Sequence, residues 1–254
     1  MKEYRIKVTL LSDTVFGSGK ALPGVVDADV LQDENGFPYM KGKTLKGKIR
    51  EEYEHLCQCR AAQRGTALAE DLESLNRLFG EPDSSIDGKI YVSNLMPDAQ
   101  LRAFFIRMMK NDSGSVGSEA NNVTKKFPGE STSESAKESL SSSNGATGIA
   151  LGSEDILNAM TSIQSFTAID DTTGIAKEGS LRRIRVINKD QIFYSTISVT
   201  DELSTHDEAL LGAAVASLRH LGTMETRGKG WVECRLLDGT EDITEACVRK
   251  LKEV

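Results

Sequence analysis

The sequence predicts an α+β fold in which one sheet is covered by helices. In residues 4–11, YRIKVTLL, apolar and polar side chains alternate, which indicates a strand with one buried face. From about Thr44, apolar side chains recur at spacings of four, four and three residues, which indicates an amphipathic helix. With 254 residues, 39% hydrophobic and 27% charged, the chain can bury a normal core. We therefore expect a single folded domain over residues 1–254.

The other core elements are expected in a definite order along the chain. They are residues 71–79 (helix), 88–95 (strand), 102–109 (extended segment), 192–199 (strand), 207–221 (helix) and 231–237 (strand). Gly222 is placed to end the second long helix. The core order of strand, helix, strand, strand, helix, strand predicts a modified ferredoxin-like fold, which RNA-recognition modules share.

Two further segments interrupt this core. Serine, glycine, asparagine and glutamate dominate residues 111–153, so we expect a flexible, serine-rich insertion there. Residues 166–189 combine a turn-rich centre with a basic flank, which indicates a protruding hairpin.

The charge of the chain is segregated. Its formal net charge is −7, so any polyanion must be held by local basic patches and not by the overall field. Three basic clusters occur, consisting of Lys41, Lys43, Thr44, Lys46, Lys48 and Arg50; Arg182, Arg183 and Arg185; and Arg227, Gly228, Lys229 and Gly230. A lysine-rich helix face is often simply solvated, and a basic turn can be no more than a strand entry. Three clusters in a net acidic chain nevertheless favour binding to a nucleic-acid backbone.

Two aspartates in the loop after the first strand are candidates for chemistry. Asp27 and Asp29 could hold a divalent cation or orient the 2′-hydroxyl of an RNA for attack on its adjacent phosphate. The alternative is that they are ordinary loop acids.

His55, Cys57 and Cys59 are dense enough to suggest a metal site, but zinc needs four ligands and no fourth lies nearby. We therefore favour the interpretation that these cysteines are buried or free thiols.

Several classes of function are disfavoured by the sequence. No stretch approaches the length of a membrane span and no early apolar run resembles a signal peptide, so we expect a cytoplasmic protein without a membrane partner. Four cysteines do not suggest a disulfide framework. Neither Gly17-Ser18-Gly19-Lys20 nor Gly42-Lys43-Thr44 has the spacing of a phosphate-binding loop, which argues against a nucleotide hydrolase.

Five segments, taken together and in order, resemble a known family. They are GVVDADVLQDENGFPYMKGKTLKGKIRE at 24–51, LNRLFG at 75–80, GKIYVSNL at 88–95, AIDDTTGIAKEGSLRRIRVI at 168–187 and LRHLGTMETRGKGWVECRL at 218–236. This succession resembles the RAMP superfamily, and within it the backbone subunits of type III CRISPR effector complexes.

The resemblance implies a specific function. Such subunits assemble as a filament along a CRISPR RNA, in contact with other copies of themselves and with other effector subunits. The segments like Gly42–Arg50 and Gly222–Gly230 contact the guide backbone, and a thumb-like hairpin, here about Ile169–Arg185, kinks the guide–target duplex. Members that cleave the paired target RNA use a loop aspartate, which matches Asp27, with a divalent metal ion, magnesium, as cofactor.

The chain also departs from the family pattern. Asp171 stands where an arginine often follows the first thumb aspartate, and Thr223, Met224 and Glu225 replace small residues in the glycine-rich loop. Relatives that bind zinc carry more cysteines. The alternative function is a non-catalytic, structural RNA-binding subunit of the same kind of complex. A stand-alone processing endonuclease is disfavoured, because neither His206 nor His220 lies in a motif suited to acid–base cleavage.

Overall fold

A computed structural model describes residues 2–64, 68–81, 88–113 and 151–253. Its main sheet is antiparallel, with β3 (Met96–Pro97) paired to β6 beside the main path. The path runs in the order β2 (Ile90–Val92), β6 (Ile192–Val199), β1 (Lys2–Leu10), β7 (Val232–Asp238) and β8 (Glu241–Asp242). The order β2-β6-β1-β7 is that of the ferredoxin-like fold, so the predicted fold class is confirmed.

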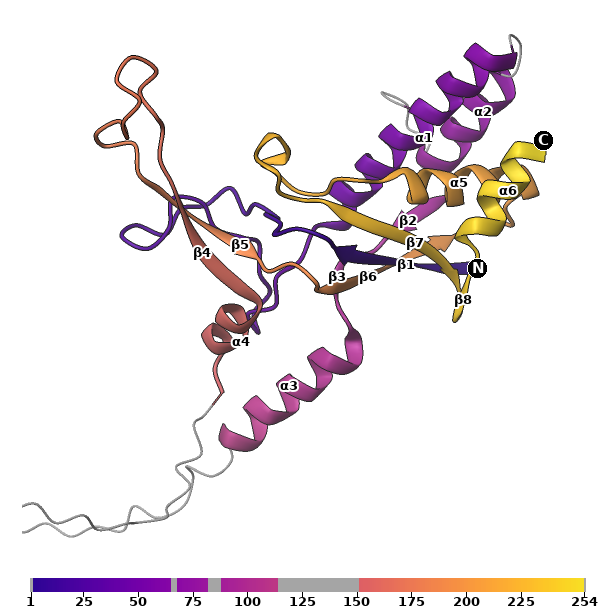
Figure 1. The fold of residues 1–254 in the computed structure, drawn as a ribbon. Helices are drawn as coiled ribbons and strands as arrows, with labels where there is room; N and C mark the ends of the chain where they lie inside the picture. The colour runs from indigo at the N-terminus through magenta and orange to yellow at the C-terminus, as the bar shows by residue number, and fades with distance from the viewer. Residues whose placement is uncertain (1, 65–67, 82–87, 114–150, 254) are drawn as a thin grey trace, which may run out of the picture.

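One face of this sheet is covered by helices (Figure 1). They are α1 (Gly42–Arg64), α2 (Leu68–Phe79), α5 (Thr205–Ser217) and α6 (Thr244–Glu253). The alternation in β1 explains the arrangement, because Tyr4, Ile6, Val8 and Leu10 are at most 1% exposed beneath the helices. Helix α5 ends at Ser217, before the predicted stop at Gly222.

The two histidines near α5 have structural partners. His206 Nε2 lies 2.8 Å from Asp71 Oδ1, and the Arg60 guanidinium lies 3.1 Å from the other oxygen of this carboxylate. Asp71 is only 1% exposed, so its charge is compensated inside the helical layer. The ring of His220 packs against Trp231 with centroids 4.2 Å apart.

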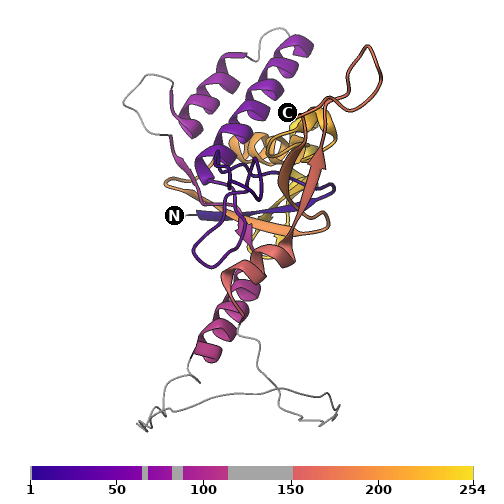
Figure 2. The same ribbon diagram turned by 90° about the vertical axis from the view of Figure 1, so that its left-hand side faces the viewer.

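Residues 102–109 were predicted to be extended, and this prediction is wrong. They form the middle of helix α3 (Ala99–Ser113), which projects from the sheet on the side opposite α1 and α2 (Figures 1 and 2). The Asp98 carboxylate accepts hydrogen bonds from the backbone N–H groups of Gln100 and Leu101, as an N-cap residue does. The apolar residues Leu101, Phe104, Phe105 and Met108 also follow helical spacing, which outweighs the β-propensity of the aromatic pair.

The segment around residues 166–189 forms an antiparallel ribbon with a long connection. Strand β4 (Thr161–Phe166) pairs with β5 (Arg182–Ile187), and residues 167–181 extend away from the body of the protein (Figure 1). Helix α4 (Ser153–Met160) leads into β4. Of the insertion expected at 111–153, residues 114–150 lie outside the described residues, while 111–113 end α3.

The chain also contains elements that were not predicted. Helix α6 and the short strand β8 follow β7, which corresponds to the last of the core strands expected from the sequence. A signal for α6 exists, because Ile243, Cys247 and Leu251 recur every four residues.

Candidate functional site

The loop between β1 and α1 brings three parts of the chain together. Isolated bridges join it to β5 at Ala28 and Ile184, and to the segment after α5 at Val15 and Thr223. A further bridge between Gly17 and Val30 closes the loop on itself. The predicted catalytic aspartate and the predicted basic clusters therefore lie around one continuous loop.

Asp27 is exposed and is attached to the edge of β5. Its backbone N–H donates to the Arg183 carbonyl oxygen at 2.7 Å, and its Oδ2 accepts the Arg183 backbone N–H at 2.7 Å. The carboxylate forms part of a hollow of about 290 Å³ whose wall includes Leu22, Val25, Leu181 and Arg183. The structure therefore places this carboxylate in a solvent-reached hollow with an arginine and apolar side chains beside it.

Asp29, two residues further on, has a different environment. Its Oδ1 lies 3.1 Å from Arg185 Nε, and only 13% and 8% of the two side-chain surfaces are exposed. Arg185 also donates from one terminal nitrogen to Asn158 Oδ1 and Thr161 Oγ1, both at 3.1 Å. Arg185, which the sequence placed among the RNA-binding residues, thus turns its guanidinium into the protein and is poorly placed to reach a phosphate.

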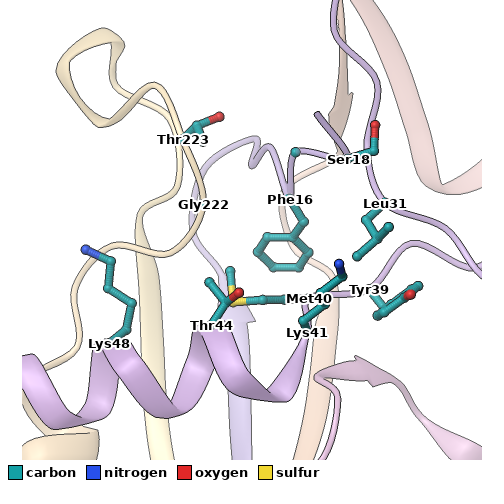
Figure 3. Close-up of a pocket in the computed structure, with 11 residues that line it drawn as sticks. Phe16, Ser18, Leu31, Tyr39, Met40, Lys41, Thr44, Lys48, Gly222 and Thr223 are labelled. Carbon is teal, nitrogen blue, oxygen red and sulfur yellow. The ribbon is translucent and has the colours of Figure 1, made fainter. Parts of the chain in front are cut away.

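The start of α1 forms a second hollow, of about 260 Å³ (Figure 3). Thr44 and Lys48 line it from the helix and Lys41 from the residue before the helix, and the facing wall comes from the first loop and from Gly222 and Thr223. The first turn of α1 contains no acidic residue. Because the N-terminus of a helix carries partial positive charge and two lysines line this hollow, it is suited to an anionic group such as a phosphate.

The other basic residues of α1 behave differently from one another. Lys43 is exposed. Lys46 Nζ donates to the Ile90 carbonyl oxygen at 2.9 Å, and the Arg50 guanidinium donates to the Gly80 carbonyl oxygen at 3.1 Å. Of these three cations, Lys46 and Arg50 thus bind backbone carbonyls of β2 and of the residue after α2.

The glycine-rich loop packs against the first loop. Gly222 has φ 96°, and a Cβ there would lie 2.5 Å from the Val15 carbonyl oxygen, so this close approach requires glycine. Gly228 and Gly230 also have positive φ, at 72° and 80°, and the exposed Gly228 has open space where a Cβ would lie. The backbone of this loop can therefore be approached closely at Gly228.

Arg227 and Arg182 meet at the base of the thumb-like hairpin. Together with Phe166 and Ser180 they line a hollow of about 380 Å³. The Arg227 guanidinium lies over the Phe166 ring, 5.9 Å from its centroid. These two predicted RNA-binding arginines come from segments far apart in the sequence, and the structure brings them together.

Asp13 is an organising residue that sequence reasoning missed. Its carboxylate accepts from Lys229 Nζ at 3.1 Å, Gln164 Nε2 at 2.8 Å and the Lys189 backbone N–H at 3.1 Å. Burial opposes ionisation of Asp13, but these hydrogen bonds outweigh it and hold its pKa below the ordinary value. The charge of Lys229, which was predicted to bind RNA, is thus largely directed to Asp13, and the pair ties the glycine-rich loop to β4.

A metal centre does not assemble from the cysteines and histidines that the structure describes. Within residues 2–64, 68–81, 88–113 and 151–253, no group of three or more histidine, cysteine or acidic side chains could hold a metal ion. Cys57 is buried, and its burial raises the pKa of the thiol to about 12, whereas His55 and Cys59 are exposed.

In the same ranges no helix is long and apolar enough to cross a bilayer.

The fold and the site define a ferredoxin-like protein with an added thumb-like hairpin. Its first loop carries an exposed aspartate, and basic hollows lie along this loop. The family model of the RAMP superfamily matches residues 7–233, and the chain belongs to this superfamily. A curated relative, the CRISPR system Cmr endoribonuclease Cmr4 of Pyrococcus furiosus, is 24% identical over 302 aligned positions, which cover 95% of this chain and 98% of the relative.

Two solved structures share the fold. One is a chain of the type III-B Cmr-beta complex in its apo state, with a TM-score of 0.57, 13% identity and coverage of 94% of this chain and 99% of that chain. The other is a chain of the same complex bound to cognate target RNA, with a TM-score of 0.55, 13% identity and coverage of 98% and 99%. At this identity the likeness concerns the fold.

Proposed function

We propose that this chain is a backbone subunit of a type III CRISPR effector complex, which holds CRISPR RNA and cleaves the paired target RNA with Asp27. The observation that carries the proposal is the position of Asp27, exposed in a hollow beside Arg183 and on the same loop as the basic hollow of α1. The relative named as an endoribonuclease, together with the fold shared with Cmr complex chains, supports the same assignment.

The basic hollows are the proposed contacts to the guide strand. Lys41, Thr44 and Lys48 would hold a backbone phosphate at the start of α1, while Arg182 and Arg227 would hold another at the base of the thumb-like hairpin. Phosphates bound there carry no base identity, so the protein would accept any guide sequence. Copies of the chain would assemble in succession along the guide, together with other effector subunits.

Cleavage would use the target RNA's own 2′-hydroxyl. The Asp27 carboxylate orients this hydroxyl and takes up its proton while O2′ bonds to the adjacent phosphorus. The bond from phosphorus to O5′ breaks, and the leaving oxygen takes a proton from water. The products are a 2′,3′-cyclic phosphate and a free 5′-hydroxyl.

The residues at the hollow are compatible with the magnesium ion that the family resemblance implies. Asp27 is the carboxylate that would hold it, because Asp29 is paired with Arg185. Magnesium in proteins is often held by one or two carboxylates, with waters and substrate phosphates completing its shell. When bound, the ion would neutralise the charge on the phosphate.

The test is target cleavage by the assembled complex carrying Asp27→Asn. Asparagine can still accept the Arg183 N–H but lacks the charge, so we expect cleavage to fall by about 10²–10⁴-fold with guide and target binding unchanged. Glu34→Gln, an exposed acid of the same loop, is the matched control and should cleave normally. EDTA should stop cleavage without releasing RNA. Normal cleavage by Asp27→Asn would leave the alternative, a structural RNA-binding subunit.

A further inference from the structure

The Asp27 segment is attached to β5 by very few backbone hydrogen bonds. Asp27 N–H donates to the Arg183 carbonyl oxygen at 2.7 Å, and Arg185 N–H donates to the Ala28 carbonyl oxygen at 3.0 Å. With the parallel bridge between Ala28 and Ile184, these contacts form a single short rung at the strand edge. Because side chains alternate along a strand, a slip of one residue would turn the Asp27 carboxylate to the other face.

The ion pair between Asp29 and Arg185 lies beside this rung. In the observed alignment Asp27 stands opposite Arg183 and Asp29 stands opposite Arg185, with Asp29 Oδ1 3.1 Å from Arg185 Nε. Asp29 Oδ1 also accepts its neighbour's backbone N–H, from Val30, at 2.9 Å, which orients the carboxylate locally.

Arg185 is itself immobilised from the other side. Its terminal nitrogen donates to Asn158 on α4 and to Thr161 at the start of β4. The side chain is 8% exposed, so its charge is unavailable to RNA. Packing alone does not require a charge here, because an apolar residue would fill the same space without the cost of desolvation. A buried, geometrically fixed charge is well suited to specifying one alignment among several.

We propose that Asp29 and Arg185 are positioning residues that lock the register of the first loop on β5 and thereby hold Asp27 in its hollow. This inference rests on the proposed function of Asp27. It assigns a role to Asp29 and replaces the RNA contact expected of Arg185.

Two variants test the proposal in the assembled complex. Asp29→Asn keeps the size of the side chain and an acceptor for Val30 N–H but removes the charge. We expect its single-turnover cleavage rate to fall by about 10²-fold, as for other small displacements of reacting groups, with guide and target affinities unchanged. Arg185→Lys keeps the charge but loses the forked geometry, and should cleave at a rate between those of Asp29→Asn and the wild type.

Hydrogen exchange provides a readout that is independent of cleavage. In Asp29→Asn the amides of Asp27 and Arg185 should exchange faster, while amides of the β1 and β6 ladder keep their protection. Wild-type exchange at both amides would overturn the proposal, as would full cleavage by Asp29→Asn when Asp27→Asn is inactive. If Asp27→Asn itself still cleaves, the proposed catalytic role fails, and the exchange data alone decide whether the pair locks the register.

Discussion

Replacing Lys41 and Lys48 together by methionine tests the phosphate site at the start of α1. Both side chains line the hollow, and methionine retains much of the aliphatic stem while removing the ammonium charge. Lys48 Nζ also lies 3.1 Å from Glu51 Oε2, but this exposed pair contributes little and can be exchanged for a phosphate. We expect weaker binding to every RNA sequence, since phosphate contacts carry no base information.

The size of the effect follows from counterion release. For a single strand, each neutralised phosphate contributes about 0.7 to the slope of log affinity against log salt concentration, so loss of the one phosphate held in this hollow lowers the slope by about 0.7. Between about 50 and 200 mM salt, the wild type should then lose roughly 2.6-fold more affinity than the double variant.

The assay is fluorescence anisotropy of a labelled RNA of guide length, titrated with protein at several salt concentrations. Lys46→Met is the matched control, because Lys46 Nζ donates to the Ile90 carbonyl oxygen and its loss should leave the slope unchanged. An unchanged slope in the double variant would refute the phosphate site. A loss of binding confined to some RNA sequences would contradict the backbone mode of recognition.

Three further predictions concern the scaffold. Iodoacetamide at neutral pH should label the exposed Cys59 before the buried thiols, of which Cys57 has a pKa raised to about 12 by burial, and mass spectrometry would show the order. Gly42→Ala should lower the free energy of unfolding by about 1–3 kcal/mol in urea denaturation, because a Cβ would overlap the Val92 carbonyl oxygen. Since the folded pKa of Asp13 is lowered, its stabilising effect is present above the ordinary value of 3.8 and lost as pH falls through the folded pKa. The gap in urea midpoint between wild type and Asp13→Asn should therefore be largest at neutral pH and shrink in acid.

The sequence predicted the sheet better than the helices around it. The strict alternation in β1 has one physical cause, a single buried face, so its prediction needed no tertiary information. In α3 the aromatic pair Phe104 and Phe105 favours a strand locally, and the helix depends on the Asp98 cap and on the spacing of Leu101 and Met108. The Asp98 cap and the helical spacing can be recognised in the sequence, whereas the direction in which α3 leaves the sheet cannot.

The sequence identified individual residues of the candidate site, but it did not predict which side chains interact with one another. Asp27 and Lys41 were identified from local charge and from the family resemblance, and both lie at hollows. The partners of Asp13, Asp29 and Lys46 could not be foreseen, because each lies far away in the sequence and is reached only once the chain has folded. Side-chain type alone does not distinguish a cation that faces solvent from one that binds a carbonyl.

The two halves of the first loop are held by different anchors, which separates RNA binding from the proposed cleavage. Near Lys41, Met40 exchanges two backbone hydrogen bonds with Leu95, at 3.0 and 2.9 Å, so the basic hollow is fixed to the β2–β3 connection. Asp27 is fixed to β5. Loss of charge at Lys41 and Lys48 should thus change the salt dependence of binding without changing the cleavage rate of bound target, while Asp29→Asn should do the reverse. A variant at either anchor that altered both properties equally would show that the loop moves as one unit.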